Sequence, residues 1–119
     1  MGKSSSTASK KVLIVDDEPQ IRAILKRYLE QSGYEVAGES ADGNEAILMA
    51  SRLQPDIVLL DNEMPVMNGE EAAGRIRASA RATRIVAVSG ALTSQPAWSD
   101  AFLNKTGLAM VGAVLDVLP

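Results

Sequence analysis

Several short apolar runs in this chain lead directly into polar side chains whose types suit phosphoryl chemistry. These side chains belong to Asp16, Asp17, Asp61, Ser89 and Lys105. Two carboxylates about 4–5 Å apart repel by about 3–4 kcal/mol at an effective dielectric near 20, so three acids at one place need a cation. The lysine can serve one acid, and Mg²⁺, a hard ion that takes oxygen ligands and keeps several waters, suits the others.

Together these groups predict a switch controlled by phosphorylation. A carboxylate beside Mg²⁺ can attack phosphorus and form an acyl phosphate, while the metal and the lysine neutralise charge on the transferring group. A serine hydroxyl can then donate a hydrogen bond to the new phosphate. Such a charge-assisted bond is worth roughly 1.5–3 kcal/mol, enough to shift a loop equilibrium by about ten- to a hundredfold.

Each residue alone also has an ordinary structural explanation. Asp17 could cap a helix that has Pro19 in its first turn, and Glu18 could be a first-turn acid favoured by the helix dipole. Ser89 is unremarkable at a strand end, and Lys105 could be a surface lysine. The joint arrangement after four separate apolar runs is what favours a site.

The pattern between these residues predicts alternating strands and helices. Strands are expected at 12–15, 34–39, 56–60, 84–89 and 101–103, and apolar stripes at helical spacing at 21–29, 46–53, 72–80 and 108–118. This alternation indicates a parallel sheet with helices on both faces, which binds ligands at the carboxyl ends of its strands. Between Ser89 and Phe102 the chain is short and contains Pro96, so a loop or a single turn is expected there.

Composition excludes several other classes of function. The 119 residues suffice for one domain, and a net charge of −3 argues against binding of nucleic acid or anionic membranes. No apolar run approaches the ~20 residues of a membrane span. The absence of histidine excludes Ser-His-Asp catalysis and a phosphohistidine donor, and the absence of cysteine favours a cytoplasmic address. Residues 1–10 are small and polar and are expected to be a disordered tail or a cloning remnant.

Four segments of the chain resemble response-regulator receiver domains. They are DDEP at 16–19, PDIVLLDNEMPVMNGEEA at 55–72, IVAVSG at 85–90 and FLNK at 102–105. The resemblance covers residues 11–118 and implies a flavodoxin-like (βα)5 three-layer sandwich with strand order 2-1-3-4-5. It also implies a domain that takes a phosphoryl group from a histidine kinase or a histidine phosphotransfer protein and catalyses only its own phosphorylation and dephosphorylation.

The resemblance also implies a role for each site residue. Asp61 matches the phosphoacceptor, and Lys105 matches the lysine that binds the phosphate. For Mg²⁺, Asp17 matches the direct ligand, Asp16 the water-mediated one, and the backbone carbonyl of Glu63 the third protein ligand. Ser89 and Phe102 match the hydroxyl and the aromatic ring that change conformation together.

Two features depart from the usual receiver pattern. Lys105 is followed by Thr106 where receivers usually have a proline in a cis peptide. Since a cis bond to a residue other than proline costs ~3 kcal/mol or more, this peptide is expected to be trans and its loop differently shaped. The shortened fourth helix and AFLNKTGL at 101–108 look like a receiver subgroup that reads PFxFATG followed by Gly or Tyr, although Ala101 stands at the proline position. That subgroup implies HWE-type kinases and alphaproteobacterial stress signalling.

Other functions stay open on the sequence. A phosphohydrolase of the haloacid-dehalogenase type is disfavoured because Asp61 is followed by Asn62-Glu63 and not by a DxD pair. A pseudo-receiver that binds partners without phosphorylation, a phosphate shuttle or sink, a stand-alone receiver and an excised fragment are alternatives. The apolar helix expected at 107–118 is either covered by its own domain or a dimer or effector surface. Glu63 is expected to slow hydrolytic water or to pair with Lys105.

Overall fold

The computed structural model describes residues 9–119 of the chain. Residues 1–8 of the predicted tail lie outside the described part. Five parallel strands form one sheet: β2 (Lys11–Val15), β3 (Glu35–Ser40), β4 (Ile57–Asp61), β5 (Arg84–Ser89) and β6 (Ala101–Asn104). Their spatial order is β3-β2-β4-β5-β6, which in chain order is 2-1-3-4-5. The predicted α/β fold and its strand order are therefore confirmed.

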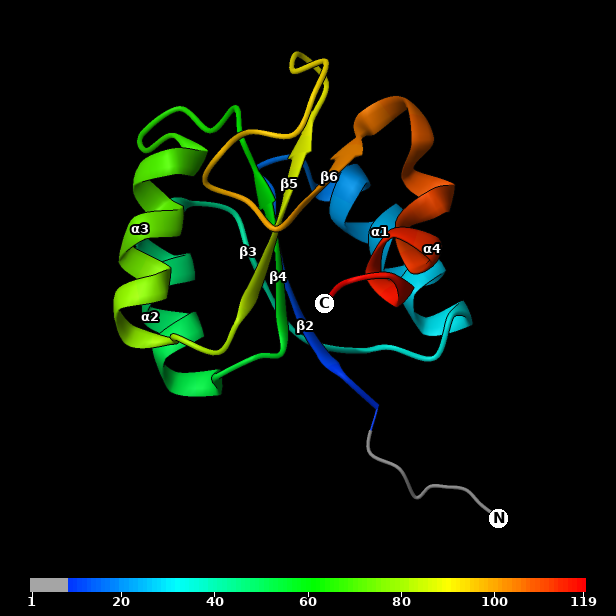
Figure 1. Ribbon diagram of the computed structural model, residues 1–119, viewed down its shortest axis with the longest axis horizontal. Coiled ribbons are helices and arrows are strands. Elements are labelled where there is room, and N and C mark those ends of the chain that lie inside the picture. The colour runs from blue at the N-terminus through cyan, green and yellow to red at the C-terminus, as the bar shows by residue number, and fades with distance from the viewer. Residues whose placement is uncertain (1–8) are drawn as a thin grey trace.

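Helices cover both faces of the sheet. On one face lie α2 (Gly43–Leu53) and α3 (Gly69–Ser79), and on the other lie α1 (Pro19–Gln31) and α4 (Val111–Asp116) (Figure 1). Side chains along each central strand alternate between the two layers. Leu13 of β2 packs toward α2 and α3, whereas its neighbour Ile14 packs toward α1 and α4. Because both faces are covered, the central strands are apolar between their end residues.

Local sequence explains where the helices begin. Asp42 and Asn68 each accept a hydrogen bond from the backbone N–H three residues later, at Glu45 and Glu71. The first helix starts at Pro19, whose fixed φ suits that position, and its N-cap residue is Glu18, with no side-chain capping bond. The interpretation of Asp17 as a cap is therefore wrong.

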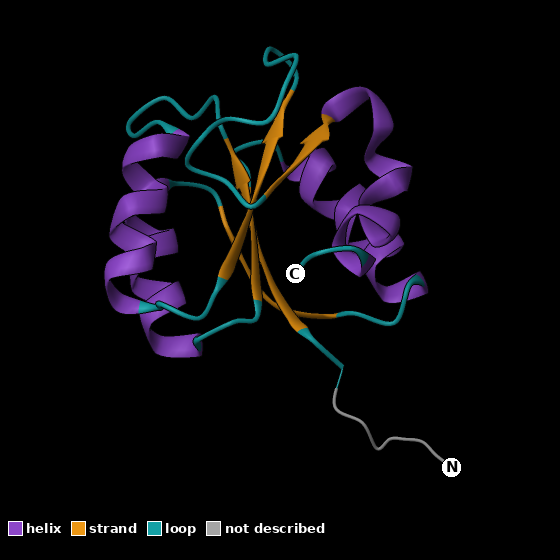
Figure 2. Cartoon of the chain, in the orientation of Figure 1, coloured by secondary structure: helices purple, strands orange, loops and turns teal. Residues whose placement is uncertain are grey.

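No helix connects β5 to β6, as the shortness of the segment predicted. Residues 90–100 form a loop (Figure 2). Arg77 of α3 fastens its far end by donating to the backbone oxygen of Trp98 at 3.0 Å and to Asp100 at 3.1 Å. Trp98 lies so close to the start of α3 that a Cβ built on Gly69 would sit 2.7 Å from its ring. The loop is thus fixed to α3 by side chains, without a helix of its own.

The last helix differs from the single helix expected over 107–118. A 3-10 segment, η1 (Lys105–Met110), precedes the short α4, and Gly107 interrupts it with φ −127° and ψ 41°. Leu108, Val111 and Leu115 are buried against α1 and the sheet, so this element is mostly covered by its own domain. All peptide bonds from residue 9 onward are trans, the one after Lys105 included, as expected. No helix in this described part is long and apolar enough to cross a membrane.

Candidate functional site

The carboxyl ends of four strands bring the predicted polar residues to one edge of the sheet. Val15 pairs with Leu60, so the residues that follow them, Asp16 and Asp61, lie at the carboxyl ends of adjacent strands. Asp61 pairs with Val88, which precedes Ser89 on the next strand. Ser89 in turn pairs with Asn104, the residue before Lys105. The convergence expected from the strand ends is therefore present.

Lys105 contacts three acids at this edge. Its ammonium nitrogen lies 3.2 Å from Asp16 Oδ2, 3.1 Å from Glu18 Oε1 and 3.4 Å from Asp61 Oδ1. Burial acts to lower the pKa of Lys105, but Glu18, Asp61 and Asp16 outweigh it and the net effect raises the pKa. The lysine therefore stays charged and compensates more than the one acid expected.

Asp61 is fully buried, and only one of its carboxylate oxygens has a hydrogen bond. Its Oδ1 accepts from the Glu63 N–H at 3.0 Å, whereas Oδ2 has no hydrogen-bond partner. Burial and then the charge of Asp16 raise the pKa of Asp61 to about 6, against the opposing effects of the Glu63 N–H and Lys105. Asp61 thus presents a free, desolvated oxygen beside a lysine.

Asp16 is also buried and completes an acidic group. Its Oδ1 accepts from the Glu18 N–H at 2.9 Å, and burial raises its pKa. Its Oδ2 has no aligned hydrogen-bond donor, although the Lys105 ammonium lies 3.2 Å away. Carboxylate oxygens of Asp16, Asp17 and Glu18 lie within 4.8 Å of one another. Two buried carboxylate oxygens without hydrogen bonds, next to this group, form a donor set that fits Mg²⁺.

Ser89 is buried, and its hydroxyl donates to a carboxylate oxygen of Glu63. The same carboxylate accepts from the Gly90 N–H at 3.1 Å and from the Asn62 side chain at 2.8 Å. Burial acts to raise the pKa of Glu63, but the hydrogen bonds from Ser89, Asn62 and Gly90 lower it overall. None of the ion pairs between described residues joins Glu63 to Lys105, so the pairing considered from the sequence is absent.

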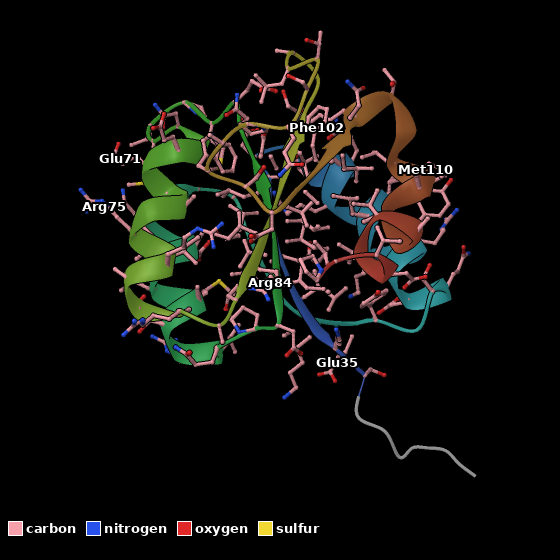
Figure 3. All side chains as sticks on the ribbon, viewed as in Figure 1. Glu35, Glu71, Arg75, Arg84, Phe102 and Met110 are labelled. Atoms are coloured by element: carbon pink, nitrogen blue, oxygen red, sulfur yellow. The ribbon has the colours of Figure 1, made fainter. Side chains whose placement is uncertain are left out.

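Phe102 lies on β6, the strand that leads to Lys105 (Figure 3). It is half-buried and pairs in register with Ala87 of β5. Its neighbour Leu103 packs toward α1 and α4, so Phe102 faces the other side of the sheet. The aromatic residue predicted from the sequence therefore lies on the strand that directly precedes Lys105.

Sequence reasoning missed the contacts of two acids and one arginine. Glu18 was taken for a first-turn acid but pairs with Lys105 across 87 positions of sequence. Arg22 of α1 donates to the backbone oxygen of Asp16 at 2.6 Å and to Glu39 at 3.3 Å. The carboxylate of Glu63 holds Ser89. The nearness of Glu18 to Asp16 was a signal in the sequence, whereas the other two contacts depend on side-chain directions across the fold.

Comparison with known proteins gives a consistent result. The profile of the family described as response regulator receiver domain matches residues 12–106. The chemotaxis protein CheY of Thermotoga maritima is 49% identical over 67 residues, 56% of this chain and 56% of that protein. The first curated relatives are matched over 19% to 56% of their length, less than two thirds.

Solved structures agree with this match. The response regulator domain of Thermotoga maritima CheB superposes with a TM-score of 0.80 at 28% identity, covering 94% of this chain and 100% of that one. A Borrelia burgdorferi complex of CheX, CheY, BeF₃ and Mg²⁺ contains a chain that is 30% identical, with a TM-score of 0.65 and coverage of 68% and 62%.

Proposed function

Because the chain belongs to the response regulator receiver domain family of two-component signalling, we propose that it accepts a phosphoryl group on Asp61 and switches through Ser89, Phe102 and Lys105. One observation carries the proposal: Asp61 is fully buried beside Lys105, yet one of its oxygens, Oδ2, has no hydrogen-bond partner. Since no neighbouring hydrogen-bond donor occupies Oδ2, this oxygen can form a bond to phosphorus.

The residues of the site divide the transfer between them. Asp61 Oδ2 forms the new bond to phosphorus while the bond to the donor's imidazole nitrogen breaks, and that nitrogen keeps the electron pair. The Glu63 N–H holds Oδ1, which leaves Oδ2 to face the donor. The Lys105 ammonium balances charge on the transferring group. The reaction is the domain's own phosphorylation, so the protein is a phosphoacceptor and not an enzyme with an external product.

Mg²⁺ is part of the proposal because the donor set fits it. The ion would be held directly by Asp17, Asp61 and the backbone carbonyl of Glu63, and through a water by Asp16. When bound, it supplies positive charge to the phosphoryl oxygens. Asp17 is exposed and belongs to the acidic group with Asp16 and Glu18, which supports its assignment as the direct ligand.

A finer part of the proposal concerns subgroup and partner. We assign the chain, as a domain over residues 11–118, to the receivers that read PFxFATG followed by Gly or Tyr, with an HWE-type histidine kinase or a phosphotransfer protein as cytoplasmic donor in stress signalling. The loop at 90–100 and the trans peptide after Lys105 support this assignment. Phosphorylation by a purified HWE-type kinase, compared with kinases of other classes, tests it, and equal rates with all classes would contradict it.

A contact of the last helix, residues 107–118, with an effector or a second copy also belongs to the proposal. Leu108 is buried in the domain, so Met110 and Val117, which are 57% and 79% exposed, are the apolar side chains left for a partner. Met110 points away from the core (Figure 3). Sedimentation of Met110→Ser beside the wild type tests for a second copy: equal masses that do not rise with concentration would remove it.

The phosphoacceptor assignment is tested by amide NMR with Mg²⁺, and then with Mg²⁺ and beryllofluoride. We expect the beryllofluoride to shift Ser89, Phe102, Lys105 and the Trp98 indole in the wild type. No shift is expected in Asp61→Asn, whereas Glu30→Gln, an exposed acid on α1, should behave as the wild type. Mg²⁺ binding without any response to beryllofluoride would favour the pseudo-receiver instead.

A further inference from the structure

Two hydrogen-bond donors at the start of the loop converge on a single carboxylate. The Ser89 hydroxyl and the Gly90 N–H both donate to Glu63, one to each carboxylate oxygen. Adjacent hydroxyl and amide donors that point to one place form a site for an anion, whether a carboxylate or a phosphoryl group. In this structure the anion is the side chain of Glu63.

This anion site lies beside the phosphoacceptor. Glu63 comes two residues after Asp61, at the end of β4, and its N–H donates to Asp61 Oδ1 at 3.0 Å. Ser89 follows Val88, the register partner of Asp61. A phosphoryl group on Asp61 would therefore meet the same hydroxyl and amide. Since both anions would need these donors, they compete for them.

The contact with Glu63 also sets the start of the 90–100 loop. The Ser89 hydroxyl oxygen accepts from the N–H groups of Ala91 at 3.0 Å and Leu92 at 2.9 Å while its proton goes to Glu63. Because Glu63 is exposed, its carboxylate can leave Ser89 and turn into water, where it is solvated. A tie of this kind can hold a loop and still be displaced.

We propose that Glu63 is an internal surrogate for the phosphoryl group: its carboxylate occupies Ser89 and Gly90 in the unphosphorylated domain and must leave when Asp61 is phosphorylated. The proposal rests on the function proposed above and adds a regulatory contact to it. Switching is then the exchange of one anion for another at the same donors, and Glu63 sets how readily the exchange occurs.

The competition predicts that removing the carboxylate favours the phosphorylated form. We expect Glu63→Gln to lower the beryllofluoride concentration for half-saturation by about tenfold, because one charge-assisted hydrogen bond no longer opposes binding. The titration is followed by Trp98 fluorescence in the presence of Mg²⁺. Glu70→Gln, an exposed acid in the first turn of α3, removes the same charge outside the site and should change half-saturation by less than about twofold.

A double-mutant cycle separates the contact from simple charge repulsion. In a Ser89→Ala background the gain from Glu63→Gln should become clearly smaller, because one of the two shared donors is gone and only the Gly90 N–H remains. A gain that persists undiminished in that background would show that Glu63 acts through its charge alone, and would overturn the proposal.

The Gly90 amide gives a readout that needs no phosphoryl analogue. Its resonance should move upfield in Glu63→Gln and stay in place in Glu70→Gln, since the carboxylate acceptor is lost in the first variant alone. An unmoved Gly90 resonance, or a wild type that binds beryllofluoride as well as Glu63→Gln does, overturns this inference and leaves the proposed function intact. A wild type that takes up no beryllofluoride overturns both.

Discussion

Asp61 carries a charge that the folded domain disfavours, and this has a consequence for stability. Its pKa of about 6 lies above the ordinary 3.8, so between these values the folded protein binds more protons than the unfolded chain. The free energy of unfolding therefore falls as the pH rises from about 4 to 6. Above the folded pKa the domain bears the full cost of the buried charge.

Asp61→Asn should accordingly stabilise the domain at neutral pH without Mg²⁺. We expect a gain of about 1–3 kcal/mol at pH 7.5, because the desolvated charge is removed, and a much smaller gain near pH 4, where the folded Asp61 carboxyl is protonated and the buried charge is absent. Urea unfolding at the two pH values measures it. Glu30→Gln, which removes an exposed acid on α1, serves as a control, and a gain of equal size for Asp61→Asn at both pH values would contradict the buried-charge explanation.

At the residue scale, the sequence predicted the positions that strand ends determine. Asp61 and Ser89 end their strands, and Asp16 and Lys105 directly follow theirs. A parallel sheet brings such residues to one edge whatever their side chains do. The carboxylate contacts of Glu18 and Glu63 were not predicted. Both leave the ends of strands through loops, where the direction of a side chain depends on tertiary packing.

Among the elements, α3 packs closely at its first residue, Gly69, against the loop at 90–100. A Cβ on Gly69 would lie 2.7 Å from the ring of Trp98 and 3.2 Å from the Cα of Asn62, whereas a Cβ on Gly74 would meet nothing within 4 Å. The two glycines of α3 therefore differ in function: one makes room, and the other only loosens the helix.

Alanine at these two glycines should change stability in opposite directions. Gly69→Ala should destabilise by about 1–3 kcal/mol through overpacking and should alter Trp98 fluorescence. Gly74→Ala should stabilise by roughly 0.5–1 kcal/mol, because alanine is the better residue in an exposed helix interior. Urea unfolding of the pair measures both effects, and a Gly69→Ala protein as stable as the wild type would show that Trp98 does not pack there.

Elements with a strong apolar period were predicted well, and the last helix was not. The strand expected at 84–89 has the observed bounds, and the other strands differ by one residue at one or both ends. The stripe from Leu108 onward suggested one helix, but Gly107 and the six-residue η1 break its start. An apolar stripe reports which residues are buried, and a 3-10 segment can bury them as well as an α-helix can.

For the whole molecule, the proposed binding of Mg²⁺ at the acidic edge of the sheet would couple metal binding to unfolding. An ion that binds the folded state alone stabilises it by about 2.7 kcal/mol at a hundred times its Kd. We expect Mg²⁺ to raise the melting temperature of the wild type and EDTA to reverse the rise. Asp16→Asn and Asp61→Asn should respond far less, and Glu30→Gln should respond fully. A rise of the same size in Asp16→Asn would contradict the assigned ligands.

The overall architecture was the most predictable level, because it depends on few features of the sequence. Apolar strands alternating with amphipathic helices permit little else than a parallel sheet with helices on both faces. The two side-chain layers follow from the alternation of Leu13 and Ile14, and of their equivalents in β4 and β5. The sequence left open whether the last helix is covered, since that depends on how closely α4 approaches α1.

The loop at 90–100 also bears on how such a domain could diverge in evolution. Its ends are held by Glu63 and Arg77, while Thr93, Ser94 and Gln95 between them are exposed. Exposed loop positions accept substitution at little cost in stability. Selection could therefore adjust the proposed switch through Glu63 and Arg77, and the outward face of the loop through the exposed residues. A helix in the same place would tie both properties to a buried stripe and to the stability of the core.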